Sequence, residues 1–259
     1  MNRKRGKRLL AVAIAVAVAV VGLVVRPWAP VRPKNLILIS MDTVRPDHLG
    51  CYGYTRPTTP RLDAYARTGA RFLQCTSSSS WTTPAHLTIF TGLEPATHGC
   101  VYYKYTGRLN ERYNTMAKIF TRRGFRTAAF TGGIYAGTRF GLDVGFEKFV
   151  EAGENFISKI DKVWSWLAVD TQRPFFLFLH GYDAHRPYVP PAQYRTRFSD
   201  GYSGDYDVVD FCRSDRSEPS PVDLRYIVSQ YDGEIAGIDD VLGDLLDRLK
   251  RRGILKDTL

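Results

Sequence analysis

The chain has 259 residues, of which 44% are hydrophobic and 13% are aromatic, so it can bury a substantial core and is not an intrinsically disordered protein. Its formal net charge of +10 is unevenly placed: residues 1–41 carry eight basic and no acidic side chains, whereas the other 218 residues carry 28 basic and 26 acidic ones. Because the body of the chain is nearly neutral, the charge excludes a typical nucleic-acid-binding surface, and one α/β domain is the expected organisation.

An apolar run follows the basic N-terminus. Residues 9–25 form an uncharged segment of 17 residues, which as a helix would be about 25 Å long, the short end of what spans a bilayer. A cleaved secretory signal peptide is the alternative, but no small-residue cleavage site follows, so we interpret residues 1–30 as an N-terminal signal anchor. The positive flank is expected to stay in the cytoplasm, so the body would be membrane-anchored and extracytoplasmic, or secreted if the segment is cleaved.

Strand and helix patterns alternate along the body. Short apolar runs predict buried strands at residues 35–40, 70–75, 125–132 and 174–181. Helical patterns occur at residues 59–68, 115–123 and 156–169, and a polar loop at residues 199–221 precedes a long amphipathic helix that ends at Gly253. This alternation predicts an α/β fold over residues 33–259, with a mostly parallel central sheet and helices on both faces.

Ligands of such sheets bind beyond the carboxyl ends of the strands, so the polar residues there are the ones to inspect. Asp42 follows the first predicted strand, and His185 follows the last. Thr82 lies just ahead of a helix that is expected to have Pro84 at its first position, so free backbone N–H groups and the positive end of the helix dipole would lie beside its hydroxyl. A metal ion held by Asp42 would lower the pKa of that hydroxyl further, which predicts a metal-assisted nucleophile.

Simpler explanations exist for several of these residues. Thr83 would serve as the N-cap ahead of Pro84, which alone would account for a hydroxyl at this point. Asp42 could cap a turn, and His185 could be an ordinary loop histidine. His180 is expected to be structural, and the acidic pair at residues 239–240 of the long helix is expected to be solvated or to cap another element.

Four blocks, in order, resemble the sulfatase family of the alkaline phosphatase superfamily. They are DTVRPDHLGCYGY from Asp42, TTPAHLTIFTG from Thr82 followed by EPATHG, PFFLFLHGYDAHRPYVPP from Pro174, and the segment from Tyr231 to the C-terminus. The resemblance runs from about Pro33 to the end and covers nearly all of the chain outside the apolar N-terminal run. It implies a hydrolase of sulfuric or phosphoric esters.

The resemblance assigns roles only where positions match. Family members hold a divalent metal with a pair of aspartates at the end of the first strand; Asp42 matches the first of them, whereas Thr43 replaces the second. The nucleophile opens a pattern of Cys or Ser, any residue, Pro, any residue, Arg. This pattern places Thr82 at the nucleophile, where it would also contact the metal, and His86 at the arginine, where it could supply part of the missing charge. His185 matches the histidine that contacts the substrate anion or the leaving-group oxygen, a general-acid role. Ca²⁺ is the first ion implied, with Zn²⁺ or Mn²⁺ as alternatives.

Threonine at position 82 changes the expected chemistry. True sulfatases oxidise the cysteine or serine to formylglycine, whose hydrate attacks sulfur and later expels sulfate by re-forming the aldehyde; threonine cannot give that aldehyde. A threonine ester must instead be cleaved by direct attack, as in related phosphatases and phosphotransferases. The sequence therefore favours a phosphoric-ester enzyme, or a phosphotransferase that modifies a cell-envelope lipid or glycan, over an arylsulfatase.

Two departures leave a non-catalytic alternative open. The family's lysine motif is absent after the predicted strand at residues 125–132, and the sequence stops at KDTL, where family members continue into a strand with further metal ligands. The chain is therefore expected to be a catalytic domain truncated on its C-terminal side, which binds a divalent ion weakly and turns over little aryl sulfate. In the alternative, an anchored sulfatase-like domain only binds an anionic glycan, lipid head group or small molecule.

Overall fold

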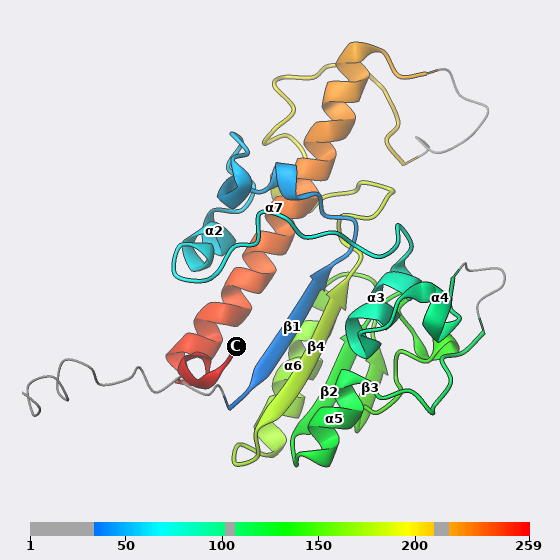
Figure 1. Ribbon diagram of the computed structural model, residues 1–259. Helices are drawn as coiled ribbons and strands as arrows, with labels where there is room; N and C mark the ends of the chain where they lie inside the picture. Colours follow the sequence, from blue (N-terminus) through cyan, green and yellow to red (C-terminus); the bar gives the residue numbers. More distant parts are fainter. Residues whose placement is uncertain (1–33, 102–106, 210–217) are drawn as a thin grey trace, which may run out of the picture. The chain divides into compact units, whose positions relative to one another are not determined.

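The structure is a computed structural model that describes residues 34–101, 107–209 and 218–259. Within this part of the chain, four strands form one sheet in the order β1-β4-β2-β3, and every adjacent pair is parallel (Figure 1). The strands are β1 (Leu36–Met41), β2 (Arg126–Thr131), β3 (Lys148–Glu151) and β4 (Phe175–Gly181). The predicted mostly parallel sheet is confirmed.

The strand predicted at residues 70–75 is wrong. That segment has no strand pairing, and Phe72 and Leu73 are 71% and 74% exposed. A continuous apolar run marks a strand only where both of its faces are covered, and here neither side chain meets a core. Conversely, the sequence does not predict β3. Its end residues Lys148 and Glu151 are charged and exposed, so the apolar run between them is too short to indicate a strand.

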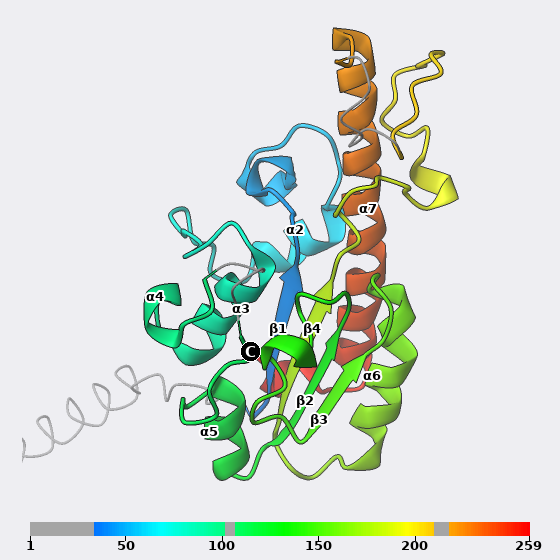
Figure 2. The same cartoon turned by 90° about the vertical axis from the view of Figure 1, so that its right-hand side faces the viewer.

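Helices cover both faces of the sheet, as expected (Figures 1 and 2). One face packs against α6 (Ile157–Val169) and α7 (Pro221–Arg251), and the other against α3 (Thr82–Thr91) and α5 (Met116–Arg122). The connections hold α2 (Pro60–Ala66), α4 (Pro95–His98) and the 3-10 helices η1 (Pro46–His48), η2 (Gly50–Tyr52), η3 (Thr138–Phe140), η4 (Ala192–Tyr194) and η5 (Leu255–Asp257).

Side chains of the central strand β4 alternate between two hydrophobic cores. Phe175, Leu177 and Leu179 belong to the core under α6 and α7, whereas Phe176 and Phe178 belong to the core under α3 and α5. This alternation is the geometric consequence of the period of two in a strand. It explains why a nearly unbroken apolar run predicts this strand correctly.

The end of the described chain lies beside the start of β1. The amide of Leu259 donates to the carbonyl of Asn35 at 3.0 Å, and the amide of Ile37 donates to the carbonyl of Leu259 at 2.8 Å. The last residues therefore add parallel backbone pairing on the side of β1 that faces away from β4.

The predicted signal anchor and its apolar run lie outside the described residues. Within the part of the chain that the structure describes, no helix combines the length and the apolarity needed to cross a bilayer.

Asp239 on the long helix α7 caps the neighbouring helix α2. It is only 2% exposed, and its two carboxylate oxygens accept hydrogen bonds from the backbone amides of Arg61 at 3.0 Å and Leu62 at 2.8 Å. These amides lie in the first turn of α2, where no intrahelical acceptor exists. α2 is thus fixed to α7 by a buried cap.

Asp239→Ala should lower the free energy of unfolding by about 1–3 kcal/mol, because two half-buried N–H groups of the first turn of α2 lose their acceptor. Asp244→Ala on the same helix is the control: its side chain is 81% exposed and pairs with Arg61, so its effect should be below about 1 kcal/mol. Urea unfolding followed by circular dichroism measures both. Equal effects would contradict the capping role.

Candidate functional site

Two strand ends and one helix start bring four side chains together at the carboxyl edge of the sheet. Asp42 directly follows β1, His180 is the next-to-last residue of β4, and Thr82 and His86 lie in the first two turns of α3. Asp42 Oδ2 accepts from Thr82 Oγ1 at 3.0 Å and lies 3.2 Å from His180 Nε2. The rings of His86 and His180 meet edge to face with their centroids 5.0 Å apart.

Asp42 is a largely buried carboxylate that keeps its charge. Its side chain is 10% exposed. Burial alone would raise its pKa, but the hydrogen bond and charge of His180, with smaller contributions from His86 and Thr82, outweigh burial and lower the pKa below the ordinary aspartate value. Asp42 is therefore ionised at neutral pH.

Thr82 is the first residue of α3, two residues earlier than the expected start at Pro84. Trp81 is the N-cap and makes no side-chain capping bond, while the Thr83 hydroxyl donates to the carbonyl of Tyr135 at 2.7 Å. Thr83 is thus not the N-cap, so helix capping does not explain why hydroxyl side chains stand at positions 82 and 83. The Thr82 hydroxyl lies at the positive end of a ten-residue helix, as predicted for a group that binds anions.

His86 is buried and neutral. Its Nδ1 donates to the carbonyl of Thr82 at 2.7 Å, which leaves Nε2 as an acceptor, 2.8 Å from the hydroxyl of Ser40. Burial lowers its pKa to about 4, with the neighbouring His180 acting in the same direction. A neutral imidazole supplies a lone pair but no positive charge, which differs from the charge role that the sequence resemblance implied for this position.

His180, expected to be structural, is the residue of this cluster that the sequence reasoning missed. It is fully buried, its pKa is lowered mainly by burial, and no described residue pairs with its Nδ1. The sequence does contain a sign of this role. In the run PFFLFLHG, His180 is two residues beyond Phe178 and four beyond Phe176, so its side chain points to the same face of the strand as theirs, and it lies at the carboxyl end of the strand. Ligands of parallel sheets bind at the carboxyl ends of the strands, so a lone histidine at that position is a candidate site residue.

Asp42, His86 and His180 form a donor set that fits a metal ion. Each offers one ligand atom, and these atoms lie within 4.8 Å of one another. Thr43, at the family's second aspartate position, does not join them: it is exposed, and its hydroxyl donates to the carbonyl of Asp42 at 2.7 Å. Its φ of 60° is unusual for a β-branched residue, a conformation that often accompanies functional loops.

Tyr182 lies next to this cluster and also lines a hollow of about 410 Å³. Its ring lies edge-on to His180 and to His185, with centroid separations of 4.5 Å and 5.5 Å. Burial raises the pKa of the Tyr182 phenol, and the neighbouring Thr82 hydroxyl partly offsets this rise, although the two hydroxyls are not in hydrogen-bond geometry. Glu154 and Glu234 also line the hollow and add acidic groups to its mixed polar and apolar lining.

His185 lies at the rim of this hollow rather than in the cluster. Its side chain is exposed, and its Nδ1 donates to the carbonyl of Arg186 at 2.8 Å. Nε2 is therefore the nitrogen that can exchange a proton. The structure brings His185 to the same pocket as Tyr182 but into no hydrogen bond with Asp42 or Thr82.

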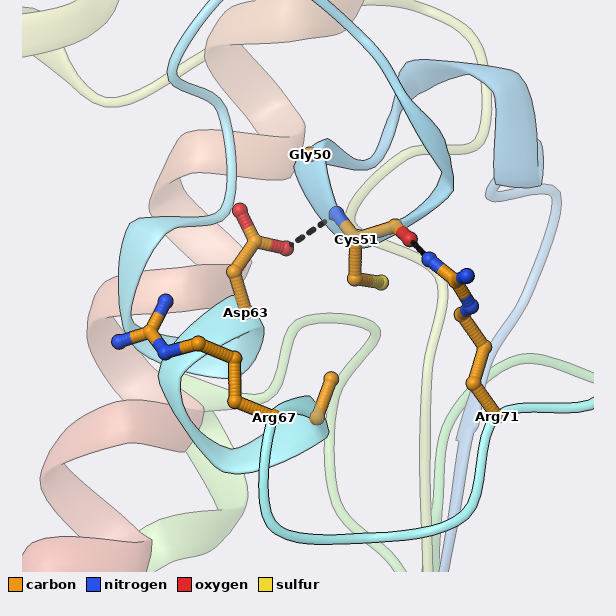
Figure 3. Close-up of a pocket in the computed structure, with 6 residues that line it drawn as sticks. Gly50, Cys51, Asp63, Arg67 and Arg71 are labelled. Carbon is orange, nitrogen blue, oxygen red and sulfur yellow. Dashed lines mark hydrogen bonds between the residues drawn. The ribbon is translucent and has the colours of Figure 1, made fainter.

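A second hollow, of about 560 Å³, lies between η2 and α2 and has different chemistry (Figure 3). Asp63 accepts from the amide of Cys51 at 2.7 Å, and Arg71 donates to the carbonyl of Cys51. Burial, followed by the Asp63 carboxylate, raises the pKa of the Cys51 thiol, which is the opposite of activation. We therefore place the candidate site at Asp42 and Thr82 rather than here.

Comparison with known proteins identifies relatives over most of the chain. A family model described as Sulfatase matches residues 34–259. Steryl-sulfatase of Mus musculus is 34% identical over 138 residues, covering 49% of this chain and 22% of that protein. N-sulphoglucosamine sulphohydrolase of Homo sapiens is 26% identical over 250 residues, covering 88% of this chain and 49% of that protein. The chain thus spans about half or less of the length of these two relatives.

A solved structure shares the fold. The phosphonate monoester hydrolase of Agrobacterium radiobacter has a TM-score of 0.65 at 20% identity, covering 88% of this chain and 61% of that one. At this identity the likeness concerns the arrangement of the sheet and helices.

His180→Gln should weaken Zn²⁺ binding by at least about 100-fold, because changes to outer-shell partners alone reduce metal affinity by about 10–100-fold. Isothermal titration calorimetry measures the affinity, and the rise in the thermal midpoint on adding Zn²⁺ gives a second readout. His185→Gln is the control and should bind Zn²⁺ as the wild type does. Unchanged binding in His180→Gln would exclude this donor set.

The neutrality of His86 predicts a pH dependence of stability. In the unfolded chain this imidazole takes up a proton near its ordinary pKa of 6.5, whereas in the folded protein it does so only at about 4. Between these values the unfolded state binds more protons, so the stabilisation is complete above pH 6.5 and is lost as the pH falls toward 4. Urea unfolding in a chelator should show a steeper loss for the wild type than for His86→Gln; identical slopes would contradict a neutral His86.

Proposed function

The chain belongs to the sulfatase family, and from this premise we propose that it is a hydrolase of sulfate or phosphate esters with Thr82 as the nucleophile. One observation carries the proposal: the Thr82 hydroxyl, at the N-terminus of α3, donates to the ionised Asp42 at 3.0 Å. A hydroxyl with an acceptor for its proton and a helix N-terminus beside it is suited to attack an anionic tetrahedral group.

The first step transfers the phosphoryl or sulfuryl group to the enzyme. Thr82 Oγ1 forms a bond to phosphorus or sulfur, and the bond from that atom to the alcohol oxygen breaks. The proton of Thr82 passes to solvent water, Asp42 keeps its charge, and protonated His185 donates a proton from Nε2 to the departing alcohol. Water then attacks the threonine ester, His185 takes a proton from that water, and the released Thr82 oxygen takes a proton from solvent.

Asp42, His86 and His180 would hold the divalent ion that this chemistry needs. Such an ion stabilises charge on the ester oxygens and lowers the pKa of the attacking hydroxyl. Two imidazoles and one carboxylate are a typical zinc donor set, whereas Ca²⁺ takes about six to eight oxygen ligands. We therefore favour Zn²⁺, which differs from the Ca²⁺ that the sequence resemblance implied first.

Phosphate esters are the favoured substrates. A threonine cannot become formylglycine, so its ester must be hydrolysed by direct attack, and this route suits phosphoryl groups. One relative is named for a steryl sulfate and the other for an N-sulfated amino sugar, and the fold neighbour is named for phosphonate monoesters. For a chain whose residues 9–25 we propose to be a membrane anchor, an ester of a cell-envelope glycan or lipid is the expected natural substrate.

The test compares p-nitrophenyl phosphate, bis(p-nitrophenyl) phosphate and p-nitrophenyl sulfate as substrates of the zinc-loaded full chain. Thr82→Val keeps the shape of the side chain but loses the nucleophile, so turnover should fall by at least about 10³-fold. Thr82→Ser should retain activity and accumulate a phosphoserine that mass spectrometry assigns to position 82. Thr91→Val, at the far end of the same helix, should match the wild type.

Two outcomes contradict the proposal. Turnover that survives in Thr82→Val shows that another group attacks. A wild type that binds inorganic phosphate but hydrolyses none of the three esters and forms no adduct is an anion-binding domain, the non-catalytic alternative. Equal or faster turnover of the sulfate would remove the preference for phosphate.

A further inference from the structure

A buried hydroxyl beside Thr82 has no hydrogen-bond partner among the described residues. It belongs to Tyr182, two residues beyond His180, at the start of the loop that leaves β4. Buried polar groups in folded proteins are almost always paired, so an unpaired one in a pocket indicates a position that a ligand completes. His180, whose ring centroid lies 4.5 Å from that of Tyr182, also has an unpaired buried atom, its Nδ1.

The Tyr182 ring is held rigidly. Its backbone amide donates to the carbonyl of Glu154 at 2.9 Å. The ring lies against Gly133, where an added Cβ would come within 2.4 Å of a ring carbon, and Gly133 has a φ of +71° that favours glycine. His180 and His185 flank the ring on its other sides. The hydroxyl is therefore fixed in position before any ligand binds, as effective electrostatic stabilisation requires.

The Tyr182 hydroxyl lies where the proposed reaction needs a hydrogen-bond donor. An ester of phosphate or sulfate carries negative oxygens that require donors, and the charge on them is redistributed during transfer. His86, at the position where the family has an arginine, has both ring nitrogens engaged, Nε2 with the Ser40 hydroxyl and Nδ1 with the carbonyl of Thr82. A donor must come from elsewhere, and Tyr182 both contacts His180 of the cluster and lines the hollow that can receive the rest of the substrate.

We propose that Tyr182 is a catalytic residue whose hydroxyl donates a hydrogen bond to an oxygen of the tetrahedral anion held at Thr82. This inference rests on the proposed function, since it takes Thr82 as the place where that anion binds. The same hydroxyl binds the inorganic phosphate product, because the product presents equivalent oxygens there.

Tyr182→Phe tests the proposal by removing a single oxygen atom. Loss of one fixed donor to a transition-state oxygen typically lowers turnover by about 10²-fold, so kcat/KM for p-nitrophenyl phosphate should fall by that order. The thermal unfolding midpoint should not fall, because the deleted hydroxyl has no partner in the free protein. A structural role would give the opposite pair of results: a lower midpoint with little change in turnover.

Tyr113→Phe is the matched control. The Tyr113 hydroxyl does have a partner, the carbonyl of Thr97 at 2.8 Å, and lies at the α4–α5 connection. Its removal should leave kcat/KM unchanged and lower the midpoint slightly. A loss of turnover in both variants would mean that Tyr→Phe changes disturb the protein generally, which contradicts the specific role of Tyr182.

Binding of inorganic phosphate, measured by calorimetry with Zn²⁺ present, separates this inference from the proposed function. If the wild type turns over esters and Tyr182→Phe stays within about twofold in kcat/KM and in phosphate affinity, the Tyr182 role is overturned while the Thr82 nucleophile stands. If the wild type hydrolyses none of the esters, the affinity for inorganic phosphate alone tests the Tyr182 role. A loss of affinity of about tenfold or more in Tyr182→Phe supports the hydrogen bond from Tyr182. Equal affinity in the two proteins, or no phosphate binding by the wild type, overturns it.

Discussion

The candidate site depends on the register in which β1 and β4 pair. Ser40 stands opposite His180, Met41 stands opposite Gly181, and the amide of Asp42 extends the ladder by donating to the carbonyl of Gly181 at 3.0 Å. Side chains alternate along both strands, so Asp42 and His180 emerge on the α3 face, the face that also receives Phe178. A slip of one residue in β4 would turn His180 toward α6 and α7 and separate it from Asp42, so the two apolar cores select the register that assembles the site.

The charge within this site makes it suited to a cation. Of the four clustered groups, Asp42 is ionised, Thr82 is neutral, and burial lowers the pKa of both imidazoles. The cluster alone therefore presents negative charge to a negatively charged ester, and the helix N-terminus supplies only partial positive charge in return. A divalent ion among Asp42, His86 and His180 would reverse the sign, and the low pKa values of the imidazoles keep their lone pairs available to it.

Sequence patterns predict three of the four strands and pick out three of the four clustered side chains; β3 and His180 are missed for physical reasons. Continuous apolar runs identify β1, β2 and β4 because each lies between two cores, whereas the partly exposed β3 carries no such run. Asp42 is found because a lone carboxylate ends an apolar strand. His180 is hidden inside such a run, and only its parity with Phe176 and Phe178 tells that it faces α3. No local pattern could show that α3 begins at Thr82 instead of Pro84, since the Thr83 hydroxyl is engaged by Tyr135, 52 residues away.

One turn of α7 holds both loops that carry the site, which gives this helix a role beyond packing. The Tyr231 hydroxyl accepts from the amide of Arg45 and donates to the carbonyl of Thr43, both at 2.8 Å, and so fixes the strained turn after Asp42. Three residues along, Glu234 accepts from the amide of Val189 at 2.7 Å in the loop after His185.

Asp232, between them, extends this support into the chain that follows β1. It is fully buried, and its carboxylate binds Arg56 at 2.9 Å, the Tyr54 hydroxyl at 2.7 Å and His48 Nδ1 at 2.6 Å. A buried carboxylate is tolerated only with such complete pairing, so the segment from His48 to Arg56 is tied to the same turn of α7. Because both loops bond to the same turn of one helix, α7 fixes the loop that carries Asp42 and the loop that carries His185 relative to each other.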